Sequence, residues 1–214
     1  MVMAMSKNTE IELKLLLQPS ELAKLLTLDV FTQAVRPDSR RERQLVSTYY
    51  DTQDMALAAH GIAYRVRDKG DGSFEATVKA SKKSSGGLSE RLELNLPIAK
   101  AEPVLDGFAA LGLGYELNTL APQGVQGLFT VRVKRITYVL QYKSAVIEMA
   151  IDKGEITTGS AKDSIDEVEL ELLEGETKDL LAYKELVAGK VSLRAEDRSK
   201  FARGLALLKQ QRGA

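Results

Sequence analysis

The sequence contains no cysteine, no tryptophan and a single histidine among its 214 residues. Without cysteine the chain can form no disulfide, no thiolate nucleophile and no zinc–thiolate centre. Its 30 basic and 30 acidic residues cancel, so no net charge attracts nucleic acid or an anionic membrane. These absences exclude thiol-based chemistry and predict that any selectivity for anions is local.

Long hydrophobic segments are also missing. No run approaches the roughly 18 apolar residues of a membrane span, and residues 1–8 lack the apolar centre of a secretory signal. The length suffices for one domain with a buried core. We therefore expect a cytoplasmic protein, monomer or homodimer, with a flexible segment 1–8, a single domain over 9–210, and neither nucleic acid nor membrane as a partner.

What the sequence does contain is a repeated pattern of charged residues two apart, with an apolar residue between them. It occurs at residues 10–14, 65–67, 77–79, 91–93, 148–152 and 167–171. Successive side chains of a strand point to opposite faces, so each stretch sends its charges one way and its Ile, Val or Leu the other. Acids gather in the first and last stretches and bases in the middle ones. A face that carries both signs suits a metal-bridged polyanion.

The order of the remaining segments predicts an α+β protein with about eight strands and four or five helices. The predicted strands are 9–17, 43–51, 61–68, 74–80, 89–96, 129–142, 145–152, 155–158 and 165–173. Helices are expected after Ser20, at 101–113 and 177–187, and at 198–209 with Asp197 as the cap. Residues 117–127, which contain Pro and Gly, are expected to form a connection.

Periodicity alone leaves the position of the charged face open. An antiparallel sheet with one face in water gives the same alternation. However, neighbouring like charges such as Glu10 with Glu12, or Glu167 with Glu169, repel one another unless a cation intervenes. Strands closed into a barrel with this face inward would instead enclose a water-filled passage.

An ordered set of motifs resembles the CYTH superfamily, also called triphosphate tunnel metalloenzymes, and most closely its bacterial inorganic triphosphatase branch. The set spans about residues 9–207. Its motifs are ExExK at 10–14, YYDT at 49–52, RxR at 65–67, TxK at 77–79, GGL with RxE at 86–93, Glu148 with DKG at 152–154, ExExE at 167–171, and SK with RG at 199–204. The helical, histidine-rich CHAD domain that often follows in this branch is expected to be absent.

The resemblance implies a closed tunnel of eight antiparallel strands with helices packed on the outside. It also implies hydrolysis of inorganic triphosphate to pyrophosphate and phosphate, with Mg²⁺ or Mn²⁺ as cofactor. An adenylate cyclase, a thiamine triphosphatase, a nucleoside triphosphatase and a noncatalytic polyphosphate or nucleotide binder are alternatives. The ionic positions show no obvious base-stacking residue, which favours the bare polyanion.

Residue roles follow from the same resemblance. The implied phosphate-binding residues are Lys14, Arg65, Arg67, Lys79, Arg91, Arg135 and Lys200, with Arg132 as the second choice in the long strand 129–142. The implied metal ligands are Glu10, Glu12, Glu167, Glu169 and Glu171. The implied catalytic residues are Lys14, Lys79, Glu93, Glu148 and Asp152, of which Asp152 could equally be structural. His60 is predicted to be a loop residue, and Tyr49 and Tyr50 to pack within a strand.

Overall fold

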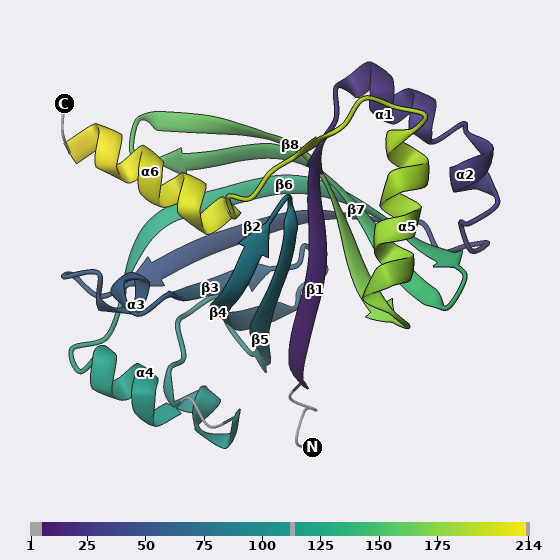
Figure 1. Cartoon of the computed structure of the whole chain (residues 1–214). Helices are drawn as coiled ribbons and strands as arrows, with labels where there is room; N and C mark the ends of the chain where they lie inside the picture. Colours follow the sequence, from purple (N-terminus) through teal and green to yellow (C-terminus); the bar gives the residue numbers. More distant parts are fainter. Residues whose placement is uncertain (1–5, 112–113, 213–214) are drawn as a thin grey trace.

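Eight long antiparallel strands close into a barrel (Figure 1) in the computed structural model, which describes residues 6–111 and 114–212. The strands are β1 (Ser6–Leu16), β2 (Arg41–Asp51), β3 (Ile62–Asp68), β4 (Phe74–Ser85), β5 (Leu88–Ile98), β6 (Gln126–Tyr142), β7 (Ala145–Thr158) and β8 (Ala161–Glu174). Their spatial order is β5-β4-β3-β2-β6-β7-β8-β1, and pairing of β1 with β5 closes the circle. A two-residue strand, β9 (Arg194–Ala195), adds to β1. The closed eight-stranded barrel is confirmed.

Short helices surround this barrel. They are α1 (Pro19–Leu25), α2 (Asp29–Thr32), α3 (Ala56–Ala59), the 3-10 helix η1 (Asp106–Leu111), α4 (Gly114–Leu120), α5 (Thr177–Ala188) and α6 (Lys200–Arg212). No helix within residues 6–111 and 114–212 is long and apolar enough to cross a membrane.

Several predicted boundaries differ from those of the structure. The helix expected at 101–113 is the shorter η1, and residues 112–113 lie outside the described part. Helix α4 occupies the start of the expected connection, because Leu117 is buried in the cluster that contains Phe108. The strands expected at 145–152 and 155–158 are one strand, β7. Of the segment expected to be flexible, residues 1–5 lie outside the described part, whereas residues 6–8 pair with β5.

The strand register fixes which side chains face the barrel interior, because directly opposite residues share a face. Arg135 lies opposite Asp152, Lys79 opposite Glu93, and Glu10 opposite Arg91. The interior set also contains Glu12, Lys14, Arg65, Arg67, Glu148, Glu167, Glu169 and Glu171. The charged face therefore points inward.

The alternate, apolar residues face outward and are covered by helices. Leu13 and Met149 pack in a cluster with Tyr183 of α5. On another side, Val66 and Phe108 belong to a cluster under α3, η1 and α4. This arrangement excludes the alternative of a sheet whose charged face lies in bulk water.

Helix α6 packs against β6, β7 and β8 and covers a third, interior apolar cluster. Tyr49 stacks on Phe129 at 4.9 Å and on Phe201 of α6 at 5.6 Å between ring centroids. Val131 and Val133 of β6 complete this packing. The inward face of β6 is thus apolar up to Val133 and becomes ionic only at Arg135. Helix α6 therefore covers the apolar part of the barrel interior, and its first turn lies next to the charged part.

Candidate functional site

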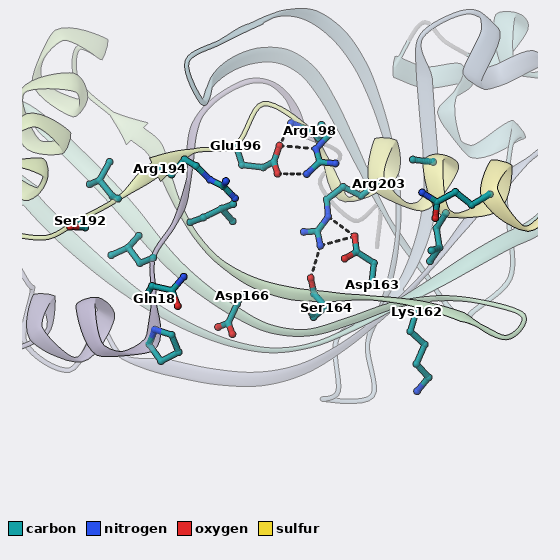
Figure 2. Close-up of a pocket in the computed structure, with 17 residues that line it drawn as sticks. Gln18, Lys162, Asp163, Ser164, Asp166, Ser192, Arg194, Glu196, Arg198 and Arg203 are labelled. Atoms are coloured by element: carbon teal, nitrogen blue, oxygen red, sulfur yellow. Dashed lines mark hydrogen bonds and ion pairs between the residues drawn. The ribbon is translucent and has the colours of Figure 1, made fainter.

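The barrel encloses a cavity of about 390 Å³ whose wall is mainly ionic. The charged residues that line it are Glu10, Glu12, Lys14, Arg65, Arg67, Glu75, Lys79, Arg91, Glu93, Arg135, Glu169, Glu171 and Lys200. They come from β1, β3, β4, β5, β6, β8 and α6, so segments far apart in the sequence build one site. A separate groove of about 880 Å³ lies on the other side of α6 (Figure 2).

A first ion-pair network is centred on Glu10. Its carboxylate accepts hydrogen bonds from Lys79 Nζ at 2.8 and 2.9 Å and from Arg91 Nε at 2.6 Å. Arg91 Nη2 also donates to Glu12 Oε1 at 3.0 Å. Lys79 Nζ lies 2.8 Å from Glu93 Oε2. Strands β1, β4 and β5 are thereby tied together across the cavity wall.

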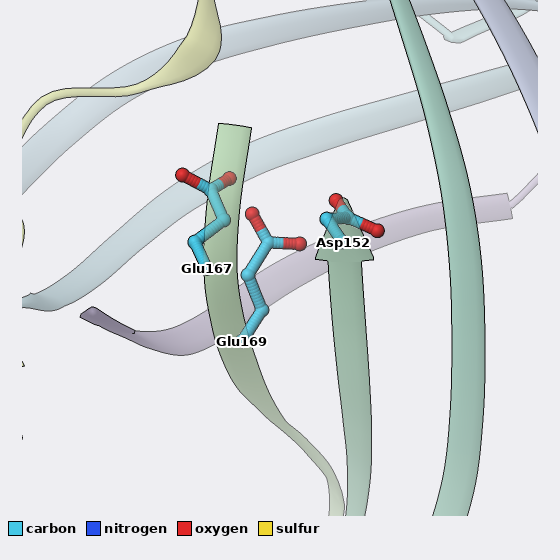
Figure 3. Close-up of side chains that lie close together, drawn as sticks. All are labelled: Asp152, Glu167 and Glu169. Carbon is cyan, nitrogen blue, oxygen red and sulfur yellow. The ribbon is translucent and has the colours of Figure 1, made fainter. Parts of the chain in front are cut away.

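A second network is built on three carboxylates that face one another, those of Asp152, Glu167 and Glu169 (Figure 3). Arg135 donates two hydrogen bonds to Asp152, at 2.7 and 2.6 Å, and one to Glu169 at 2.7 Å. Lys200 Nζ lies 2.8 Å from Asp152 Oδ2 and 2.9 Å from Glu169 Oε1, and it also contacts Glu167 Oε1. We call these three acids the carboxylate triad.

Lys14 connects the two networks. Its Nζ lies 3.5 Å from Glu12 Oε1 and 3.8 Å from Glu169 Oε1. The side chain is only 5% exposed. Charges therefore alternate without interruption from β4 through β5 and β1 to β8.

The β3 side of the cavity carries excess positive charge. Burial, together with Arg65 and Arg135, lowers the pKa of Arg67 to about 9. Arg65 lies 3.7 Å from Glu93, and its buried Nε has no hydrogen-bond partner among the described residues. Although burial raises the pKa of Tyr49, the nearby cations, Arg65 first, lower it overall. Although burial lowers the pKa of Arg65, Tyr49 and Glu93 raise it overall. The excess positive charge is therefore centred on Arg67, and it favours an anionic ligand.

The opposite, β7–β8 side carries excess negative charge. Burial, with repulsion from Glu10 and Glu93, raises the pKa of Glu171 to about 8. The pKa of Glu148 is also raised, mainly by burial and against the effect of Arg135. Both shifts mean that the ionised carboxylates lack sufficient positive charge nearby. A bound cation would supply it.

The carboxylate triad fits a divalent metal. One oxygen from each of Asp152, Glu167 and Glu169 lies within 4.8 Å of the other two. Burial raises the pKa of Glu169, but Lys200, Arg135 and Lys14 hold it well below its usual range, so the group is an ionised ligand. Oxygen donors of this kind suit hard cations such as Mg²⁺ and Mn²⁺.

Comparison with known proteins identifies the family, because the CYTH domain matches residues 8–205. The chain belongs to the CYTH family. An inorganic triphosphatase of Haemophilus influenzae is 30% identical over 205 residues, which cover 94% of this chain and 56% of that protein. The chain thus spans a little over half the length of this curated relative.

Solved structures agree on the CYTH fold. A Bacillus halodurans protein described as an adenylate cyclase candidate superimposes with a TM-score of 0.62 at 20% identity, covering 92% of this chain and 97% of its own. A Hippeastrum protein, assigned as an adenylyl cyclase and reported to have a dominant triphosphatase activity, gives a TM-score of 0.56 at 19% identity over 92% and 95% of the two chains. At these identities the likeness establishes the barrel.

The structure brings the residues expected from the CYTH resemblance together, with one exception. Arg132 is exposed on the outer face of β6, because even-numbered residues of this strand point away from the interior. Lys134, on the same face, pairs with Glu42 at 2.6 Å. Arg135 is the basic residue of this stretch that reaches the cavity. The residues expected to bind one metal together lie in two different ion-pair networks, since Glu10 belongs to the first network and Glu167 to the second.

Sequence reasoning assigned no role to Arg203, which contacts Glu167 of the triad and lines the groove on the other side of α6 (Figure 2). Its guanidinium donates to Asp163 Oδ2 at 2.9 Å and to the Ser164 carbonyl oxygen, and its Nη1 lies 3.4 Å from Glu167 Oε2. Arg203 follows Lys200 by three residues, and residues three apart share one helix face. This spacing is the sequence signal that could have identified Arg203.

The start of α6 also differs from the expectation. The helix begins at Lys200, and Ser199 Oγ accepts a hydrogen bond from the Ala202 backbone N–H. Asp197, the expected cap, accepts a hydrogen bond from the Gly87 backbone N–H. The connection before α6 is thereby fastened to the β4–β5 turn, which helps to bring Lys200 into the barrel.

Proposed function

We propose that this CYTH protein is a metal-dependent hydrolase that cleaves inorganic triphosphate to pyrophosphate and phosphate in the barrel cavity. The observation that carries the proposal is the division of the barrel wall into a β3 side with Arg65 and Arg67 and a β7–β8 side with the carboxylate triad, of which Glu169 lines the cavity. Such a wall complements a polyanion bridged by a cation. The resemblance to the Haemophilus inorganic triphosphatase supports the same substrate.

The phosphate oxygens bind the cations that line the cavity. Arg65 and Arg67 donate paired hydrogen bonds that fix orientation, whereas lysines act as point charges. The proposed phosphate-binding set is Lys14, Arg65, Arg67, Lys79, Arg91, Arg135 and Lys200. Ion pairs with Glu10, Glu93 and the triad hold several of these side chains in place before the substrate arrives. Preorganised charges of this kind stabilise a transition state without reorganisation cost.

The metal is Mg²⁺ or Mn²⁺. Asp152, Glu167 and Glu169 would hold it, with Glu10 and Glu12 of the adjoining strand β1 and Glu171 of β8 as further acidic ligands. When bound, a divalent cation neutralises the transferred phosphoryl group and acidifies a bound water. Among the chain's own residues, Glu93 and Glu148 orient the attacking water.

A second candidate is hydrolysis of an organic triphosphate, such as a nucleoside or thiamine triphosphate. The ionic positions carry no base-stacking residue, but Phe201 and Leu205 line the cavity beside them, together with Tyr49, which stacks on Phe129 and Phe201. These side chains offer an apolar surface to a base or a ring. The substrate assay must therefore compare organic and inorganic triphosphates.

The test is phosphate release from inorganic triphosphate, ATP, thiamine triphosphate and pyrophosphate, each with Mg²⁺ and with Mn²⁺. Fast release from inorganic triphosphate supports the proposal, and preference for an organic substrate supports the second candidate. Cyclic AMP formed from ATP would indicate a cyclase, and tight binding without release a noncatalytic binder; both would refute hydrolysis.

A matched pair of variants links the activity to the cavity. Arg67→Ala removes a cation from its wall, and Arg40→Ala removes one from an exposed ion pair with Glu42. The first should lose activity and the second should keep it. Equal effects would place the reaction elsewhere. The cytoplasmic location and the monomeric or homodimeric state stay predictions, to be checked by fractionation and by light scattering.

A further inference from the structure

Lys200 occupies the position in which the carboxylate triad would hold a metal. Its ammonium contacts one oxygen of each acid, Asp152 Oδ2, Glu167 Oε1 and Glu169 Oε1. The side chain is 7% exposed, and those of Asp152 and Glu167 are 0% exposed. A cation that belongs to the chain itself therefore already lies among the three carboxylates, and Arg135 and Arg203 supply further positive charge.

The remaining triad oxygens are also engaged. Arg135 Nε donates to Asp152 Oδ1, and Arg135 Nη2 to Glu169 Oε2. Arg203 Nη1 lies 3.4 Å from Glu167 Oε2. An incoming cation that takes one oxygen from each acid at the position of the Lys200 ammonium competes with Lys200 for the same three oxygens. At such short range the ammonium and a divalent ion also repel each other strongly.

We propose that Lys200 and the divalent metal compete for the triad, and that metal binding releases the Lys200 ammonium toward the cavity. The side chain can make this change alone, because lysine has a flexible four-carbon stem. Helix α6 stays in place because Arg203 ties it to Asp163 and Ser164 (Figure 2), and Phe201 and Leu205 pack on the interior apolar cluster.

Competition couples the metal to the anion. Without a polyanion, Lys200 weakens metal binding, because the metal must first displace it. A polyanion in the cavity attracts the released ammonium, so each ligand strengthens binding of the other. Lys200 thus serves as an internal counter-ion that, together with Arg135 and Arg203, balances the charge of the triad until both ligands are present. The inference rests on the metal centre of the proposed function, and it concerns metal affinity rather than turnover.

The test is Mn²⁺ titration without substrate, followed by the electron paramagnetic resonance signal of free Mn²⁺. Competition predicts that Lys200→Gln binds Mn²⁺ at least about tenfold more tightly than the unaltered protein, the change that about 1.4 kcal/mol produces. A residue that simply helped to hold the site would give weaker binding. Unchanged or weaker binding by Lys200→Gln overturns the proposal.

Two control variants remove the same charge elsewhere. Lys162→Gln breaks an exposed pair with Glu155 and should leave the Mn²⁺ affinity unchanged. Lys79→Gln removes a cation from the first network, next to Glu10 and Glu93, and should have a smaller effect than Lys200→Gln. An equal or larger effect of Lys79→Gln would place the metal at Glu10 and overturn the proposal.

Circular dichroism shows whether Lys200→Gln is folded. If it is not, Lys200→Arg supplies the test, since a guanidinium keeps the charge and holds carboxylates more firmly through its rigid set of donors. Competition then predicts weaker Mn²⁺ binding than in the unaltered protein, and tighter binding overturns it. If the protein hydrolyses triphosphate but the Lys200 variants show no change in Mn²⁺ affinity, the proposed function stands and the competition proposal is refuted. If the Mn²⁺ affinities change as expected but triphosphate is not hydrolysed, the competition proposal stands and the proposed function is refuted.

Discussion

Substitution of Asp152 by Ala tests whether the second ion-pair network supports the fold as well as the site. The Asp152 side chain is fully buried and accepts two hydrogen bonds from Arg135, at 2.7 and 2.6 Å. Lys200 Nζ lies 2.8 Å from the same carboxylate. Removing Asp152 leaves two buried cations that share only the remaining acids of the triad.

The size of the effect follows from this geometry. Removal of one partner of a buried ion pair costs about 3–5 kcal/mol. Arg135 and Lys200 keep contacts with Glu169, so we expect the lower end of this range. For a chain of this length, about 3 kcal/mol corresponds to a fall in Tm of roughly 6–12 °C.

The assay is urea and thermal unfolding in the presence of EDTA, followed by circular dichroism. A double-mutant cycle with Asp152→Ala and Arg135→Ala separates the pair from other changes. We expect a coupling free energy of about 1–3 kcal/mol, as found for residues in direct contact.

The exposed pair of Arg40 and Glu42 is the control. Their Nη2 and Oε2 atoms lie 2.6 Å apart, but the side chains are 51% and 38% exposed. Exposed pairs contribute about 0.2–1 kcal/mol. If the coupling of Asp152 with Arg135 is no larger than that of this control, burial does not strengthen the network and our reasoning is refuted.

Three further predictions concern the cavity and its closing helix. Lys79→Ala should lower kcat/KM for triphosphate by about 10²–10³-fold without unfolding the protein, since it removes one preorganised charge; unchanged kinetics would remove Lys79 from the site. In metal-free buffer the pKa of Glu171 is about 8 in the folded state and near 4.5 in the unfolded state. The free energy of unfolding should therefore fall as the pH rises between these values, and it should fall less steeply in Glu171→Gln. Equal slopes of the free energy against pH in urea unfolding would contradict this. A Cβ on Gly204 would lie 2.3 Å from the Phe129 ring, so Gly204→Ala should destabilise the packing of α6 by about 1–3 kcal/mol, and an unchanged Tm would show that the helix can shift freely.

Several parts of the fold could be predicted from local sequence because strand geometry has a period of two. Arg65 and Arg67 lie on one face of their strand and Val66 lies on the other, independently of the rest of the chain. The same period puts Arg135 on the face of its strand opposite to Arg132 and Lys134. It could not choose which face is interior, because that depends on the pairing of β1 with β5 that closes the barrel.

Position along a strand was harder to predict than orientation. Val133 and Arg135 both face inward, yet the first packs on the interior apolar cluster and the second binds Asp152. The difference arises from α6, which comes about 70 residues later in the sequence and covers only part of the barrel. No local pattern in β6 contains that information.

The sequence by itself determined the alternation of charged and apolar side chains, the absence of thiol chemistry and the identity of the charged groups, since these depend on residue type and strand period. The tertiary structure decided which charges meet. It separated Glu10 from Glu167, brought Asp152 into the triad, and placed Lys200 of the last helix among three acids. Contacts between residues so distant in sequence arise only when the barrel closes and α6 packs against it.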